Sequence, residues 1–244
     1  MESIEIKELD LNYVRPNSDS IETDIGGMKI IVIGRPGSGK STLIKSLIAS
    51  KRHLIPAAVV ISGSEEANHF YKNLFPECFV YNKFNLSLID RIHKRQITAK
   101  NLLDKMSWLL LIIDDCMDDS KLFCDKMVMD LFKNGRHWNI LVIVASQYVM
   151  DLKPVIRSTL DGVFLLREPN MSYKEKMWLN FASIIPKKYF FDLMEEITQD
   201  HTALYIDNTA INPSHWSDCV KYYKATIENV DEPFGCEEYK SYII

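Results

Sequence analysis

KIIVIGRPGSGKST, residues 29–42, is the stretch that decides the fold of this chain. Its first part, 30–33, is a short run of β-branched apolar residues, which is typical of a buried strand. The following residues, 34–41, match the pattern G-x-x-x-x-G-K-[ST] at every fixed position. Apolar residues at positions 43, 44, 47 and 48 then have the spacing of one helix face. Strand, glycine loop and helix therefore follow one another in the order that a phosphate-binding loop needs.

Each residue type in this loop has a chemical role in holding phosphates. Glycines let the backbone turn its N–H groups inward, and these donors act together with the positive end of the helix that follows. We expect Lys40 to reach the β- and γ-phosphates of ATP, and the hydroxyl of Ser41 to bind Mg²⁺. The residues predicted to bind the nucleotide are Gly34, Arg35, Pro36, Gly37, Ser38, Gly39, Lys40, Ser41 and Thr42.

Composition limits the class of protein. The chain has 244 residues, of which 47% are hydrophobic and 25% are charged, and these values are ordinary for a globular protein. Even an apolar run as long as any in the chain, 108–113, is too short to span a bilayer, and the first residues lack the core of a signal peptide, so we expect a cytosol-like compartment. Five cysteines form no C-x-x-C pair, which predicts reduced thiols. The net charge of −4 argues against an extensive basic surface, although a local basic face remains compatible with DNA contact.

The second landmark is WLLLIIDD, residues 108–115. A continuous apolar run that ends in acids is typical of a buried parallel strand with carboxylates at its carboxyl end, where a P-loop fold binds its nucleotide. We expect Asp114 to hold Mg²⁺ and Asp115 to accept a proton from the attacking water. The alternative for this pair is a role in a loop or in capping a helix.

A third strand, predicted over 140–145, ends in Ser146 and Gln147. A glutamine beside the γ-phosphate can orient water, and the alternative is an exposed polar strand end. Further strands are predicted at 57–61, 79–81, 163–166 and 203–206, and helical segments at 85–106, 121–133 and 172–198, the last broken near Pro186.

Strands that alternate with helices predict an α/β fold, with a mainly parallel central sheet flanked by helices. We divide the chain into an N-terminal arm (1–27), an ATPase core (28–168) and a C-terminal extension (169–244) that packs on the core or continues it.

The helical segment near 85–106 carries the chain's basic cluster, and two interpretations of it stay open. One is a solvated helix face, and the other is a surface that contacts DNA phosphates, with Lys94 and Arg95 as candidates. The cluster has six basic residues against two acidic ones: Lys83, Arg91, Lys94, Arg95, Lys100 and Lys105 against Asp90 and Asp104.

Three classes of function remain. A GTPase needs an Asn-Lys-x-Asp motif, but residues 82–85 read NKFN and precede the Asp-Asp strand. The acids at 114–115 and Gln147 favour hydrolysis, so an ATPase is the first hypothesis. A P-loop nucleotide or polynucleotide kinase is the second, and a binding module switched by ATP is the third.

Four segments together resemble the DNA-packaging ATPases of large nucleocytoplasmic DNA viruses, members of the HerA/FtsK superfamily. They are GRPGSGKST, the strand ending IIDD, GRHWNI (135–140) and VIVASQY (142–148), and the resemblance covers about residues 28–168. It implies a RecA-like ATPase, stimulated by DNA, with Lys40 and Ser41 in the Walker A motif, Asp114 in the Walker B motif, Asp115 as catalytic base and Gln147 as sensor. Many relatives have Glu at the base position, and Asp is shorter.

The resemblance also implies an arginine finger and partners. Arg136 matches the candidate finger that acts on a neighbouring subunit's nucleotide, and Arg157 is a rival for that role. The implied assembly is a homo-oligomeric ring, a pentamer or hexamer, that moves double-stranded DNA into capsids. The implied location is the host cytoplasm, in the viral factory, with association to capsid proteins and virions.

Overall fold

A computed structural model describes residues 5–23, 25–116, 122–226 and 230–243. Its described residues form one nine-stranded sheet, in the order β1-β9-β8-β7-β2-β6-β5-β3-β4. The pairs that involve β2, β3, β5 and β6 are all parallel, whereas β8 runs antiparallel to both of its neighbours. The predicted α/β fold with a mainly parallel sheet is therefore confirmed. The strands are β1 (Lys7–Glu8), β2 (Lys29–Ile33), β3 (Ala57–Ser62), β4 (Val80–Tyr81), β5 (Leu109–Asp114), β6 (Ile140–Ser146), β7 (Gly162–Leu165), β8 (Thr202–Asp207) and β9 (Val220–Lys224).

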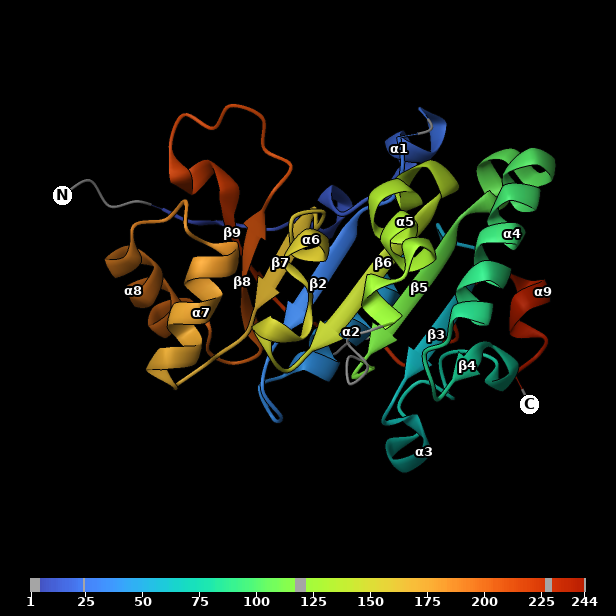
Figure 1. The fold of residues 1–244 in the computed structure, drawn as a ribbon, viewed down its shortest axis with the longest axis horizontal. Coiled ribbons are helices and arrows are strands. Elements are labelled where there is room, and N and C mark those ends of the chain that lie inside the picture. Colours follow the sequence, from blue (N-terminus) through green and yellow to red (C-terminus); the bar gives the residue numbers. More distant parts are fainter. Residues whose placement is uncertain (1–4, 24, 117–121, 227–229, 244) are drawn as a thin grey trace.

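Helices cover both faces of this sheet, with α5, α6 and α7 in front of it and α2 behind it in Figure 1. The helices are α1 (Ser18–Glu22), α2 (Lys40–Lys51), α3 (Glu65–Asn68), α4 (Leu86–Leu103), α5 (Lys126–Asn134), α6 (Pro154–Arg157), α7 (Met171–Phe181), α8 (Lys187–Ile197) and α9 (Glu237–Lys240). None of the helices in the described ranges is both long enough and apolar enough to cross a bilayer.

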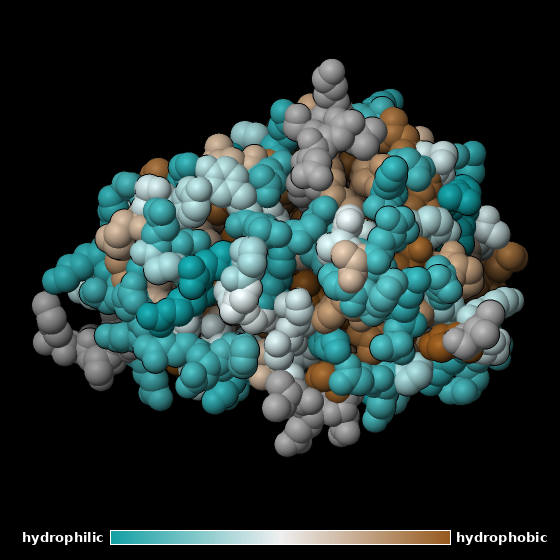
Figure 2. Space-filling model, turned by 90° about the horizontal axis from the view of Figure 1, so that it is seen from below, coloured by the Kyte–Doolittle hydropathy of each residue, from teal (hydrophilic) through white to brown (hydrophobic). Residues whose placement is uncertain are grey.

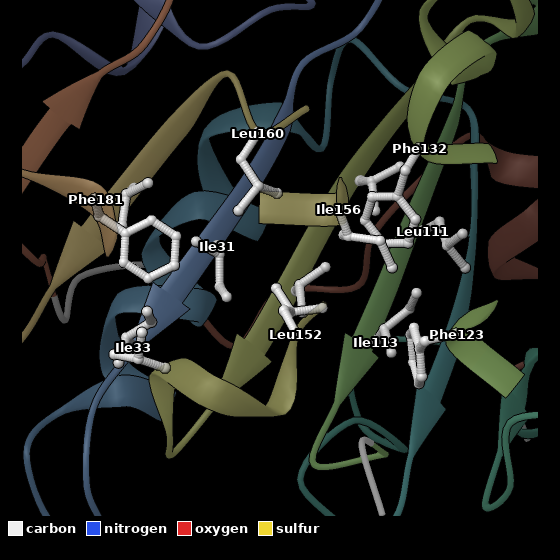
Figure 3. Close-up of a cluster of buried hydrophobic side chains, with 14 of the residues drawn as sticks. Ile31, Ile33, Leu111, Ile113, Phe123, Phe132, Leu152, Ile156, Leu160 and Phe181 are labelled. Atoms are coloured by element: carbon white, nitrogen blue, oxygen red, sulfur yellow. The ribbon is translucent and has the colours of Figure 1, made fainter. Parts of the chain in front are cut away.

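Alternate residues of each central strand enter two separate hydrophobic clusters, one on each face of the sheet. Ile31 and Ile33 of β2 pack with residues of α5, α6 and α7, as Figure 3 shows, whereas Ile30 and Val32 pack with α2. Burial on both faces explains why these strands are continuously apolar instead of alternating between apolar and polar residues.

The N-terminal arm adds a strand to the sheet, and the C-terminal extension packs on the core. Within the arm, β1 pairs with β9 at one edge of the sheet, so the arm contains a strand and the helix α1. Near the C-terminus, Phe234 is fully buried against Phe75.

The helix predicted over 121–133 begins at Lys126, because the Asp125 side chain caps it by accepting from the Met127 N–H. Residue 121 lies outside the described part.

Candidate active site

The glycine loop lies between β2 and α2, at the carboxyl edge of the parallel strands. Gly37 and Gly39 have φ angles of 76° and 94°, a backbone region that L side chains rarely adopt. Gly39 caps the N-terminus of α2, and Lys40 and Ser41 form its first turn. Figure 2 looks onto this edge from below and shows a mainly hydrophilic surface. The loop and the N-terminus of α2 are therefore accessible at this edge, where an anion can reach them.

Asp115 lies between the two other residues predicted to act on the γ-phosphate. One of its carboxylate oxygens, Oδ1, is 3.1 Å from Lys40 Nζ, and Gln147 Nε2 donates to the other, Oδ2, at 3.1 Å. Hydrogen bonding in the sheet explains the convergence, since β6 lies between β2 and β5. The structure therefore brings together Lys40, Asp115 and Gln147 from three separate segments.

Asp114 ends β5 and is buried, with 8% of its surface exposed. Its Oδ2 accepts a hydrogen bond of 2.9 Å from the Tyr71 hydroxyl, whereas Oδ1 has no partner among the described residues. Burial raises the pKa of Asp114 from 3.8 to about 6, and the nearby charge of Lys40 opposes that rise. A buried carboxylate oxygen without a partner is costly unless a cation occupies the space beside it.

This orphaned oxygen fits the predicted Mg²⁺ site. Carboxylate and hydroxyl oxygens are the ligands that Mg²⁺ prefers, and Ser41, the expected second ligand, is exposed in the first turn of α2. Among the described residues no cluster of three or more His, Cys, Asp and Glu side chains could hold a metal by itself.

Tyr71 is a residue of this site that the sequence reasoning missed. It follows α3, is fully buried, and its backbone N–H donates to both carboxylate oxygens of Glu65, at 3.0 and 3.1 Å. Glu65 is also fully buried and accepts from the Lys72 N–H at 3.0 Å. The carboxylate of Glu65 thus fixes the backbone that holds the Tyr71 hydroxyl on Asp114. No sequence motif marks a tyrosine 43 residues before its partner.

Tyr71→Phe should weaken the Mg²⁺-dependent part of nucleotide binding by about 10- to 100-fold, because the partners that orient metal ligands contribute that much to metal affinity. ATP titrations with and without Mg²⁺ measure this difference. Tyr223→Phe is a matched control, since it removes a hydrogen bond from another buried tyrosine hydroxyl, to Ser46. An unchanged Mg²⁺ effect in Tyr71→Phe would show that the hydroxyl does not orient Asp114.

Asp114→Asn should stabilise the metal-free protein at pH about 7.5. The folded-state pKa of Asp114 lies above its unfolded value, so folding binds a proton, and stability falls as pH rises from about 4 to 6. The full penalty, at most about 3 kcal/mol, is present above pH about 6, and asparagine avoids it. Thermal unfolding in the presence of a chelator measures this difference. The melting temperature of Asp114→Asn should exceed that of the wild type by roughly 2 to 4 °C for each kcal/mol of unfolding free energy recovered. The difference between the two proteins should be smaller at pH about 5. A lower melting temperature than wild type at pH about 7.5 would contradict this.

The two candidate arginine fingers lie at the opposite, amino edge of the sheet. Arg136, just before β6, and Arg157, at the end of α6, line one hollow of about 870 Å³, together with Lys29 at the start of β2. Arg157 donates to the backbone oxygens of Leu152, at 2.7 Å, and Val149, at 3.4 Å. Arg136 is exposed, and its side chain makes no hydrogen bond or ion pair with the described part of the chain. Neither arginine lines the hollow beside the glycine loop.

The two tentative DNA-binding residues lie on α4 and differ in exposure. Lys94 is exposed and forms an ion pair with Asp90, one helical turn away, at 2.6 Å. Arg95 is half-buried and hydrogen-bonds to Gln96, and burial lowers the pKa of its guanidinium. These contacts do not test whether Lys94 or Arg95 binds DNA, so that role stays a prediction.

Comparison with known proteins identifies relatives over almost the whole chain. A family model described as "Poxvirus A32 protein" matches residues 19–219. An uncharacterized protein of Frog virus 3 (isolate Goorha), 015R, is 56% identical over 99% of this chain and 76% of its own length. An uncharacterized protein of Invertebrate iridescent virus 3, 088R, is 44% identical over 98% of this chain and 93% of its own length.

Among solved structures, the genome packaging NTPase B204 from Sulfolobus turreted icosahedral virus 2, in complex with AMPPCP, is similar with a TM-score of 0.58. The similarity covers 82% of this chain and 98% of that protein, at 17% sequence identity. At this identity the likeness establishes the shared fold.

Proposed function

The chain belongs to the family described as Poxvirus A32 protein, and from that premise we propose that it is an ATPase that packages viral genomes by translocating double-stranded DNA. One observation carries the enzymatic half of this proposal. Asp115 is held between Lys40 and Gln147 beside the glycine loop. A carboxylate and a glutamine amide that converge beside the γ-phosphate position can deprotonate and orient a water molecule, as hydrolysis needs. The packaging role is supported by the shared fold with B204, which is itself named a genome packaging NTPase.

The geometry supports a sequence of proton and charge movements at the γ-phosphate. When ATP binds, its γ-phosphate competes with Asp115 for the Lys40 ammonium, which turns toward the phosphate. Asp115 is then free to accept the proton of a water molecule that attacks the γ-phosphorus, and the Gln147 amide orients that water. The products are ADP and phosphate. Ser41 and Asp114 would hold Mg²⁺, which when bound neutralises charge on the phosphate oxygens.

A second cation for the transition state comes from a neighbouring subunit. Among the described residues, Lys40 is the basic side chain that contacts Asp115, while both candidate arginines line a hollow at the opposite edge of the sheet. The proposal requires a ring, pentameric or hexameric, in which the amino edge of one subunit meets the carboxyl edge of the next. Arg136 suits the finger role better than Arg157, because its guanidinium is exposed and unpaired within the described residues. Hydrolysis is then coupled to subunit contact, which a motor needs.

On this proposal the ring fills capsids in the host cytoplasm, within the viral factory, together with capsid proteins. The test of translocation is displacement of the third strand from a triplex DNA, with ATP supplied as fuel. A translocating ring should displace that strand only when ATP can be hydrolysed, and not with a non-hydrolysable analogue. Displacement by the analogue, or none in the presence of active hydrolysis, would contradict the motor. Transfer of labelled phosphate to a nucleoside or a DNA end would instead favour the kinase.

A further inference from the structure

A second hollow lies directly beside the glycine loop and has no role in the chemistry described above. Its volume is about 260 Å³. One wall is the loop itself, at Arg35, Gly37 and Ser38, and the other is Arg167 with the turn 198–202. This volume is slightly below the usual range for whole small-molecule sites, about 300–1,000 Å³, and therefore suits part of a ligand.

The sheet order gives the direction in which a bound triphosphate runs. Its γ end is marked by Asp115 and Gln147, which directly follow β5 and β6, on one side of β2. The hollow lies on the other side of β2, since Arg167 follows β7 and the turn 198–202 leads into β8, as Figure 1 shows. A linear phosphate chain with its γ end at Lys40 therefore leaves the glycine loop toward this hollow.

The turn 198–202, which forms the far wall of the hollow, packs against the glycine loop. A Cβ atom on Gly39 would lie 2.6 Å from His201 Nδ1, so the imidazole packs directly against the loop. The backbone around it is held on both sides, by the hydrogen bond from Thr202 N–H to Gln199 O, 2.8 Å, and from Ala225 N–H to His201 O, 3.2 Å. His201 itself has a φ of 62°, a conformation that this packing must stabilise.

We propose that this hollow binds the base and ribose of the nucleotide, a proposal that rests on the proposed ATPase function. Three planar groups surround it: the guanidinium groups of Arg35 and Arg167 and the imidazole of His201. Such groups stack on the π-face of a base. Arg167 is further oriented at the rim by Glu195, whose carboxylate is 3.6 Å away. Polar side chains of the turn, Gln199 and Asp200, supply acceptors for base amino groups and ribose hydroxyls.

The test compares ATP with inorganic tripolyphosphate, which has the phosphates but no nucleoside. Calorimetric titration, both with Mg²⁺, gives the two dissociation constants for each variant. His201→Ala should raise the dissociation constant of ATP by about tenfold, within the range that loss of base stacking produces, and leave that of tripolyphosphate unchanged. Arg167→Ala should act in the same direction. His201→Phe keeps a planar ring and should retain most of the affinity for ATP. Lys188→Ala, an exposed position of α8 outside the hollow, is the control for loss of a positive charge.

Two outcomes would overturn the proposal. One is unchanged ATP affinity in both alanine variants. The other is an equal loss for ATP and tripolyphosphate, because His201 would then support the glycine loop and not the nucleoside. If the wild type binds neither ATP nor tripolyphosphate, the ATPase function itself is refuted. That result differs from the two outcomes above, in which the wild type binds ATP.

Discussion

Arg136→Ala should bind ATP as tightly as the wild type and hydrolyse it about 10³-fold more slowly, or worse. The reason is location. Arg136 lies at the amino edge of the sheet, away from its own glycine loop, so its removal leaves the subunit's own nucleotide contacts intact. Its charge is then missing only from the transition state in the neighbour's site. Nucleotide binding and steady-state turnover, measured on the same assembled protein, separate the two effects.

Arg157→Ala is the matched control for Arg136→Ala. Arg157 donates to the backbone oxygens of Leu152 and Val149, so its removal should lower stability by about 1 to 3 kcal/mol and affect turnover little. Mixing subunits gives a sharper test of action across the interface. Arg136→Ala and Asp115→Asn subunits, each inactive alone, should recover part of the activity in mixed rings, because some interfaces then combine an intact base with an intact finger. Normal turnover in Arg136→Ala would transfer the finger role to Arg157.

Asp115→Asn should reduce turnover by about 10² to 10⁴-fold and leave ATP bound. The carboxylate that accepts the proton of water is gone, whereas asparagine keeps its size and can still accept from Gln147. ATP affinity should rise, because the Lys40 ammonium no longer has an ion pair 3.1 Å away that competes with the γ-phosphate. Single-turnover hydrolysis and a binding titration measure the two quantities. Asp192→Asn, which neutralises an exposed carboxylate on α8, is the control. Hydrolysis within a few fold of wild type would exclude Asp115 as the base.

The central strands could be predicted because burial on both faces makes them continuously apolar. Residues 30–33 and 109–113 are fully buried strands, and the acids that follow 113 lie where a parallel sheet binds ligands. The edge strands could not be predicted in the same way. β1 has only two residues, both exposed, and its pairing partner β9 lies more than 200 residues further along the chain. Such pairing depends on the sheet that is already present and leaves no local pattern.

In the site, too, residues that stand in local motifs could be predicted, and residues that act through tertiary contacts could not. Lys40, Asp114 and Asp115 stand in local motifs, so their roles could be inferred from spacing alone. Tyr71 and Gly26 act through contacts that no local pattern records. A Cβ atom on Gly26 would lie 2.0 Å from the Arg136 carbonyl oxygen, so the N-terminal arm packs directly against the backbone of the proposed finger. Contacts of this kind follow from tertiary packing, and only the structure reveals them.

The most direct test of the central claim is steady-state ATP hydrolysis by the purified protein, with and without double-stranded DNA. We expect hydrolysis that DNA stimulates and that disappears in Lys40→Ala, the variant that lacks the ammonium paired with Asp115. Lys40-dependent hydrolysis that ignores DNA would support the ATPase but contradict a motor driven by DNA. No hydrolysis under conditions in which the protein binds ATP and phosphorylates an added acceptor would contradict the account as a whole.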